Sequence, residues 1–187
     1  MSAPDTHWTV LVAHPETRRD AVSGIAVEAR LETAATLVCS YSLHGDLARV
    51  RLTDEGAGRS AEGLWEHTCF EAFIGVQGAR GYYEFNFSPT LDWAAYRFTD
   101  YRVGMAPATL SQPPGLHVHR SSDRLQLTAT LHLRGLAPLC TAPALRLAMA
   151  AVIEDQLGAL SYWALEHPPG RPDFHHPENF TIELRSS

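Results

Sequence analysis

Apolar and polar residues alternate along much of this chain, so that every second side chain is apolar. In the segment LQLTATLHL (125–133), Leu125, Leu127, Ala129, Leu131 and Leu133 would share one face of an extended chain. This period of two is typical of a β-strand with one buried face. Related patterns predict further strands at residues 25–32, 36–45, 144–155, 160–166 and 179–185.

Segments rich in glycine, proline and aspartate separate these strands and predict turns. They lie at residues 54–63, 111–115, 134–143 and 167–179. One stretch, LDWAAYRFTDYR (91–102), is expected to form a helical turn or two. Many short strands with such breaks predict an all-β fold, namely a jelly-roll-like antiparallel β-sandwich. No internal repeat or linker divides the chain, so residues 1–187 are expected to form a single domain.

The composition argues against two classes of partner. The formal net charge is -6 and no lysine- or arginine-rich block occurs, which disfavours nucleic acid because clustered cations bind its phosphates. No apolar run approaches the roughly 18 residues of a membrane-spanning helix. The first residues lack the pattern of a secretory signal, and Cys39, Cys69 and Cys140 lie far apart. We therefore expect a cytoplasmic protein with reduced thiols.

The segments CFEAFIGV (69–76) and YYEFNFSP (82–89) predict a β-hairpin that carries two acidic residues. Centring the pairing on the loop at 77–80 predicts a core face with the apolar pairs Phe70–Phe87, Ala72–Phe85 and Ile74–Tyr83. The same register predicts the pairs Glu71–Asn86 and Phe73–Glu84 on the opposite face. A slip of one residue would mix the two sets, so the pattern specifies its own alignment.

The second face of the hairpin admits three interpretations. It could meet solvent, and Glu71 and Asn86 would then need no special role. It could bind a sugar, because aromatic rings stack on a pyranose while carboxylates and amides bind its hydroxyl groups. It could also be catalytic, since retaining glycoside hydrolysis uses two carboxyl groups about 5 Å apart, which Glu71 and Glu84 could supply. Nothing in the sequence shows the separated pKa values that such catalysis needs.

Three stretches together resemble the bacterial DOMON-like domains, which are related to family-nine carbohydrate-binding modules. They are LWEHTCFEAFIG (64–75), YYEFNFSPTLDWAAYRFTDYRVGM (82–105) and LSYWALEHPPGRPDFHHPENFTIEL (160–184). The resemblance implies a jelly-roll-like β-sandwich with a ligand-binding role, since members of this superfamily bind sugars or haem. It also implies a binding role for Glu71, which matches an acidic position that recurs in these modules.

Several residues near the hairpin are candidate ligand-binding residues. Trp65, Trp93 and Trp163 are candidates for the aromatic sugar clamp that this resemblance implies, although a tryptophan is more often a core residue. His67, at the entrance of the first strand, could hydrogen-bond a polyol or cap the strand.

Three more candidates follow the hairpin. Tyr101 and Arg102 could close over a ligand. Arg97 could contribute to the site, but its simplest role is an ion pair with Glu84 or Asp92 that fixes the sheet.

No metal or cofactor is expected. The stretch PDFHHPE (172–178) invites a zinc interpretation, but adjacent histidines on an extended chain point to opposite sides. A structural zinc site also needs four ligands, and the sequence does not indicate the others. Calcium could bind through Asp173, but the sequence contains no EF-hand-like loop. His117 and His119 share one strand face, but two ligands do not make a site.

The leading functional hypothesis is therefore a non-catalytic module that binds a small polar ligand, such as a carbohydrate. A glycoside-active enzyme using Glu71 and Glu84 is one alternative. Haem binding is another and follows from the resemblance; Met105, Met149 and the histidines could supply axial ligands, but their spacing singles out no pair. An interaction module whose sheet face meets a partner protein is the fourth hypothesis.

Overall fold

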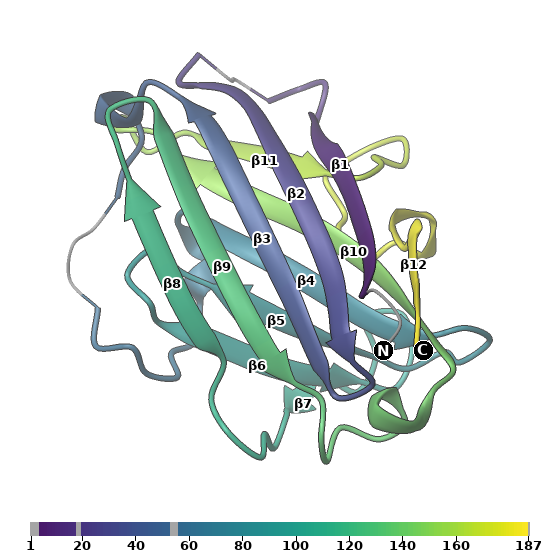
Figure 1. The fold of residues 1–187 in the computed structure, drawn as a ribbon. Coiled ribbons are helices and arrows are strands. Elements are labelled where there is room, and N and C mark those ends of the chain that lie inside the picture. Colours follow the sequence, from purple (N-terminus) through teal and green to yellow (C-terminus); the bar gives the residue numbers. More distant parts are fainter. Residues whose placement is uncertain (1–3, 18–19, 53–55, 187) are drawn as a thin grey trace.

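The computed structural model describes residues 4–17, 20–52 and 56–186, which form two layers of antiparallel strands (Figure 1). The layer in front in Figure 1 contains β8, β9, β3, β2 and β1, side by side in that order. Its strands are β1 (Asp5–Ala13), β2 (Val22–Thr33), β3 (Thr36–Gly45), β8 (Gly115–Arg120) and β9 (Arg124–His132).

The second layer lies behind the first and carries the hairpin. Its strands are β4 (Cys69–Val76), β5 (Tyr82–Phe87), β6 (Trp93–Phe98), β7 (Ala106–Pro107), β10 (Ala144–Glu154), β11 (Leu160–Ala164) and β12 (Ile182–Arg185). They run in the order β7-β6-β5-β4-β10-β11, and β12 pairs with the first part of β10.

Strand β1 joins the two layers into one folded sheet. Its first part, Asp5–Leu11, pairs with β2, whereas Val12 and Ala13 pair with β11. The sheet therefore folds over on itself and encloses a core between its halves. The prediction of an all-β, antiparallel sandwich is confirmed.

The main core fills the space between the layers. Strand β9 shows the expected alternation, since Leu125, Leu127, Ala129 and Leu131 are buried and the residues between them are partly exposed. The phenol ring of Tyr41 from β3 packs against Phe70 and Phe87 of the hairpin. Buried apolar area of this kind is the main source of stability in a sandwich.

The outer face of the second layer is also buried. Phe73, Tyr82 and Phe98 form a second apolar cluster there together with Phe174, which comes from the segment between β11 and β12. Because both faces are covered, every residue of β5 is buried. Phe98 and Phe174 of this second cluster line the candidate site described below.

Helical structure in the described residues is limited to short 3₁₀ turns. They are η1 (Leu47–Arg49), η2 (Leu64–Glu66), η3 (Leu139–Thr141) and η4 (Pro177–Asn179). None of the helices in the described part of the chain has the length and apolar character needed to cross a membrane.

The expected helical turn within residues 91–102 is wrong. Trp93–Phe98 is strand β6, which pairs antiparallel with β5 along its whole length. Its side chains alternate, with Trp93 and Ala95 against the main core and Tyr96 and Phe98 in the second cluster. Pairing with a neighbouring strand overrides the weak local preference of this segment.

Candidate functional site

The predicted register of the hairpin is confirmed at every pair. Glu71 lies opposite Asn86 and Phe73 lies opposite Glu84. The apolar pairs Phe70–Phe87, Ala72–Phe85 and Ile74–Tyr83 also form, and their members belong to the main core. The acidic residues and Asn86 consequently share the outer face of the second layer.

This outer face does not meet bulk solvent. Glu71 is 4% exposed, Glu84 is 5% exposed and Asn86 is fully buried. The solvated-face interpretation is therefore wrong, because the segment between β11 and β12 covers the hairpin. Taking carboxyl groups out of water costs free energy unless hydrogen bonds or opposite charges compensate.

A pocket of about 580 Å³ lies above the two acids. Its walls come from strands β4, β5, β6, β10 and β11 and from the loops after β6 and β11. Most of the lining is apolar or aromatic, with acidic groups and an arginine among it. The lining residues are Trp65, Glu66, Glu71, Glu84, Phe98, Arg102, Met105, Val152, Leu160, Tyr162, Pro172, Phe174 and His175.

Hydrogen bonding to the acids is incomplete. The Asn86 amide donates from Nδ2 to Oε1 of Glu84 over 2.8 Å, while Oδ1 of Asn86 is buried without a partner among the described residues. The Glu71 backbone carbonyl accepts a hydrogen bond from Tyr41, but its carboxyl group has no such partner in the described part of the chain. Polar groups this deeply buried are normally paired. The Glu71 carboxyl group lines the pocket and can meet a ligand there, whereas Asn86 does not line the pocket.

The pKa values of both acids are raised. Burial raises the pKa of Glu71 well above its ordinary value, and the negative charge of Glu84 raises it further. Burial also raises the pKa of Glu84, against the opposing effects of the Asn86 hydrogen bond and the Arg102 charge. A buried pair of carboxyl groups resists losing its second proton because two like charges would then face each other in a medium of low dielectric constant.

His175 forms one wall of the pocket and remains neutral near pH 7. Its Nδ1 atom lies 2.8 Å from the Tyr82 hydroxyl, and its Nε2 atom lies 3.8 Å from Oε2 of Glu84. Burial and the nearby charge of Arg102 lower the pKa of His175 to about 4. The sequence suggested this histidine only as a metal ligand, because nothing local indicates that it folds back over the hairpin.

Arg102 reaches the pocket from the loop after β6. Its backbone φ of 56° lies in the left-handed region, which is uncommon for a residue with a side chain. Nε and Nη2 donate to Oδ1 of Asp173 over 3.1 and 2.6 Å, and the Tyr101 hydroxyl donates to the same carboxylate. Tyr101 and Arg102 thus join the two loops at the edge of the pocket, although Tyr101 does not line it.

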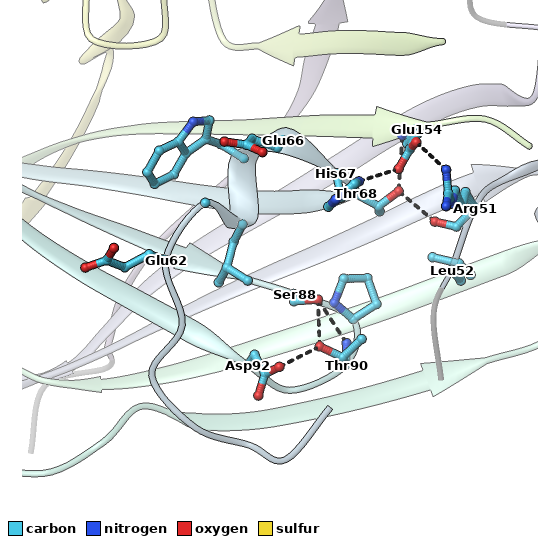
Figure 2. Close-up of a pocket in the computed structure, with 14 residues that line it drawn as sticks. Arg51, Leu52, Glu62, Glu66, His67, Thr68, Ser88, Thr90, Asp92 and Glu154 are labelled. Atoms are coloured by element: carbon cyan, nitrogen blue, oxygen red, sulfur yellow. Dashed lines mark hydrogen bonds and ion pairs between the residues drawn. The ribbon is translucent and has the colours of Figure 1, made fainter. Parts of the chain in front are cut away.

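Trp65 lines both this pocket and a second depression of about 630 Å³. Figure 2 shows the second depression. Trp65 belongs to η2, is 38% exposed and packs edge-on against Tyr96. An exposed indole on the rim of a pocket offers a stacking surface. Of the three predicted tryptophans, it is the one that lines the pocket.

His67 lines only the second depression. Figure 2 shows it pointing at Glu154, whose Oε2 atom lies 2.8 Å from Nδ1 of His67. Arg51 donates to the other oxygen of the same carboxylate over 3.0 Å. His67 therefore ties the start of β4 to the end of β10, away from Glu71 and Glu84.

Three predicted residues lie away from the pocket. Trp163 is 3% exposed in the main core and donates from its indole nitrogen to Ser161. Trp93 packs against the same core. Arg97 follows the alternation of β6 and projects on the opposite face from Glu84, so the expected ion pair with Glu84 does not form. The described residues show no ion pair of Arg97 with Asp92 either. The prediction that these residues bind the ligand is not supported by the pocket lining. Alternation alone does not say which face of β6 or β11 the pocket occupies.

The comparisons with known proteins establish a fold. No protein-family model matches the chain, and no curated protein matches its sequence. A proposed carbohydrate-binding protein from Bacteroides uniformis is 14% identical, with a TM-score of 0.69 over 97% of this chain and 86% of that protein.

Two further similar structures show a family-nine carbohydrate-binding module from Caldicellulosiruptor kristjanssonii. The complex with cellotriose is 10% identical with a TM-score of 0.59, and covers 97% of this chain and 82% of that one. The complex with glucose is 10% identical with a TM-score of 0.54, over 97% and 84% of the two chains. The chain thus has the β-sandwich fold of these proteins.

Proposed function

We propose that this protein is a non-catalytic carbohydrate-binding domain and that its ligand occupies the pocket above Glu71 and Glu84. The observation that carries the proposal is the carboxyl group of Glu71. It is almost completely buried, lines an open pocket and lacks a hydrogen-bond partner among the described residues. A ligand hydroxyl group would supply the missing donor.

The other walls suit a sugar ring. Trp65 offers an exposed indole face, while Phe98 and Phe174 supply apolar surface deeper in the pocket. Sugar sites commonly combine aromatic stacking with a few well-placed polar groups. The volume of about 580 Å³ lies within the usual range of small-ligand pockets.

The similar folds support the same class of ligand. Family-nine modules bind cellotriose and glucose in the structures compared above. We place this chain with those modules and the related DOMON-like domains as part of the proposal, since sequence identities of 10–14% do not by themselves transfer a ligand.

Titration calorimetry with glucose, cellobiose, cellotriose and xylobiose tests the proposal. We expect heat of binding for at least one sugar, and at least tenfold weaker binding in Glu71→Gln, which keeps the size of the side chain but removes its ionisable carboxyl group. Glu183→Gln is the matched control, because Glu183 is exposed on β12 and pairs with Arg185.

Two results would overturn the proposal: binding of no sugar, or equal binding by wild type and Glu71→Gln. Aryl-glycoside hydrolysis that disappears in Glu84→Gln would instead assign an enzyme to this pocket.

A further inference from the structure

The pocket holds more acidic than basic side chains. Glu71 and Glu84 form its floor, and the exposed carboxylate of Glu66 stands at the rim. The basic side chains in the lining are Arg102 and His175. The neutral state of His175 near pH 7 leaves Arg102 as the lining residue with a positive charge.

The charge of Arg102 is already compensated. Both its Nε and Nη2 atoms donate to Oδ1 of Asp173, so the two side chains form a close ion pair. The Asp173 carboxylate also accepts the Tyr101 hydroxyl and the His175 backbone N–H. Asp173 therefore takes the hydrogen bonds of Arg102. The Arg102 charge still lowers the pKa values of both glutamates, but neither carboxyl group has a hydrogen-bonded cation among the described residues.

Aromatic side chains surround these acidic groups. Trp65, Phe98, Tyr162 and Phe174 contribute to the walls. The faces of aromatic rings attract cations, and the attraction strengthens when water is excluded. A carboxyl group that is 4% exposed and unpaired among described residues, set within such walls, is suited to a positively charged ligand group.

Building on the carbohydrate-binding function proposed above, we propose that the ligand carries a protonated amine and that the pocket prefers an amino sugar to the neutral sugar of the same ring. The ammonium group would lie between Glu71 and Glu84, where it donates hydrogen bonds to both carboxylates. Asn86 lies behind them, outside the pocket lining, and holds Glu84 through the hydrogen bond from its amide. Charge-assisted hydrogen bonds of this kind are stronger than those of a neutral hydroxyl group.

Proton binding to the two glutamates would be linked to binding of the ligand. The pKa values of both glutamates are raised, so protons compete with the ammonium group for the carboxylates. The charged or titratable groups around the pair include Glu66, Arg102, Asp173, His175, Tyr82, Tyr162, Cys69, Tyr96 and Tyr41. Ammonium binding would release protons from the pair, and its affinity would fall as the pH is lowered.

Titration calorimetry at pH 7 with five probes tests this inference. The probes are glucose, 2-amino-2-deoxyglucose, 6-amino-6-deoxyglucose, N-acetylglucosamine and glucuronate. We expect at least one amino sugar to bind at least tenfold more tightly than glucose, and acetylation of the 2-amino group to abolish any advantage of that isomer. Repeating the titration in two buffers of different ionisation enthalpy should reveal proton release with the amino sugar and none with glucose.

Glutamine variants separate the effect of the glutamate charge from the effect of side-chain shape. Glu84→Gln keeps the acceptor for the Asn86 amide but removes a charge, so we expect the ratio of amino-sugar to glucose affinity to fall at least fivefold while glucose still binds. Glu32→Gln, an exposed change on β2 in the other layer, should leave the ratio unchanged. Glu71→Gln is a second variant with the same expectation for the ratio, should Glu84→Gln fail to fold.

The outcomes distinguish this inference from the function on which it rests. Equal affinity for glucose and both amino sugars, or tighter binding of glucuronate, would overturn the preference for an amine and leave the carbohydrate-binding function standing. A ratio unchanged in Glu84→Gln would also overturn it. Binding of none of the probes would count against both.

Discussion

The Tyr41 hydroxyl in one layer donates a 2.8 Å hydrogen bond to the backbone carbonyl of Glu71 in the other. The bond is buried in the main core, directly beneath the strand that carries the candidate ligand-binding carboxyl group. It joins the two halves of the folded sheet at the position of the pocket.

We expect Tyr41→Phe to lower the free energy of unfolding by about 1–3 kcal/mol, because the carbonyl of Glu71 would lose this buried donor while the ring is retained. Urea denaturation measures the change. Tyr162→Phe is the control, since its hydroxyl makes no hydrogen bond with the described residues and its removal should cost less. Equal losses in the two variants would contradict a specific role for the Tyr41 bond.

The raised pKa of Glu71 predicts a pH-dependent gain in stability for Glu71→Gln. A carboxyl group with a raised pKa in the folded state stabilises the fold below its unfolded pKa, near 4.5, and loses that contribution as the pH rises through the folded pKa. Glutamine cannot ionise. The stability of the variant relative to wild type should therefore be greater at pH 8 than at pH 5.

Chemical denaturation of both proteins at pH 5 and pH 8 checks this expectation. A difference that stays constant between the two pH values would show that Glu71 does not titrate abnormally. Glu183→Gln should show no comparable trend, because Glu183 is exposed.

The lowered pKa of His175 predicts that the fold loses stability as the pH falls. This pKa is lowered to about 4, so the contribution of the histidine to stability is present above the unfolded pKa of about 6.5 and is lost as the pH falls through 4. His175→Asn keeps an acceptor for the Tyr82 hydroxyl but does not titrate. Between pH 6.5 and 4, it should lose less stability than wild type does, by about 3 kcal/mol at most. Thermal unfolding across this range measures the slope, with His117→Asn on the exposed face of β8 as control.

Trp65 and Trp163 should respond differently to truncation. Trp65→Ala removes a rim indole that is 38% exposed, so it should weaken sugar binding at least tenfold with little loss of stability. Trp163→Ala opens a cavity in the main core and should cost about 3–5 kcal/mol. Calorimetric binding and urea denaturation of both variants check this. If Trp163→Ala weakened sugar binding and Trp65→Ala did not, the result would contradict a ligand site in the pocket above Glu71.

The sequence carried enough information to place the acids relative to their neighbours. Alternation in β4 and β5 sorts Phe70 and Phe85 from Glu71 and Glu84, and a slip of one residue would mix the two sets. It did not reveal what covers the second face. Phe174 and His175 come from a proline-rich stretch whose own pattern indicates only a loop.

The sequence by itself therefore determined the class of fold and the side of the sheet on which Glu71, Glu84 and Asn86 lie, because side-chain direction in a strand follows from local geometry. Only the tertiary structure decided that this side is a pocket. Return of the segment after β11 buries the acids, pairs Arg102 with Asp173 and brings His175 beside Glu84. Those contacts join residues distant in the chain, and their energies depend on burial that no local pattern records.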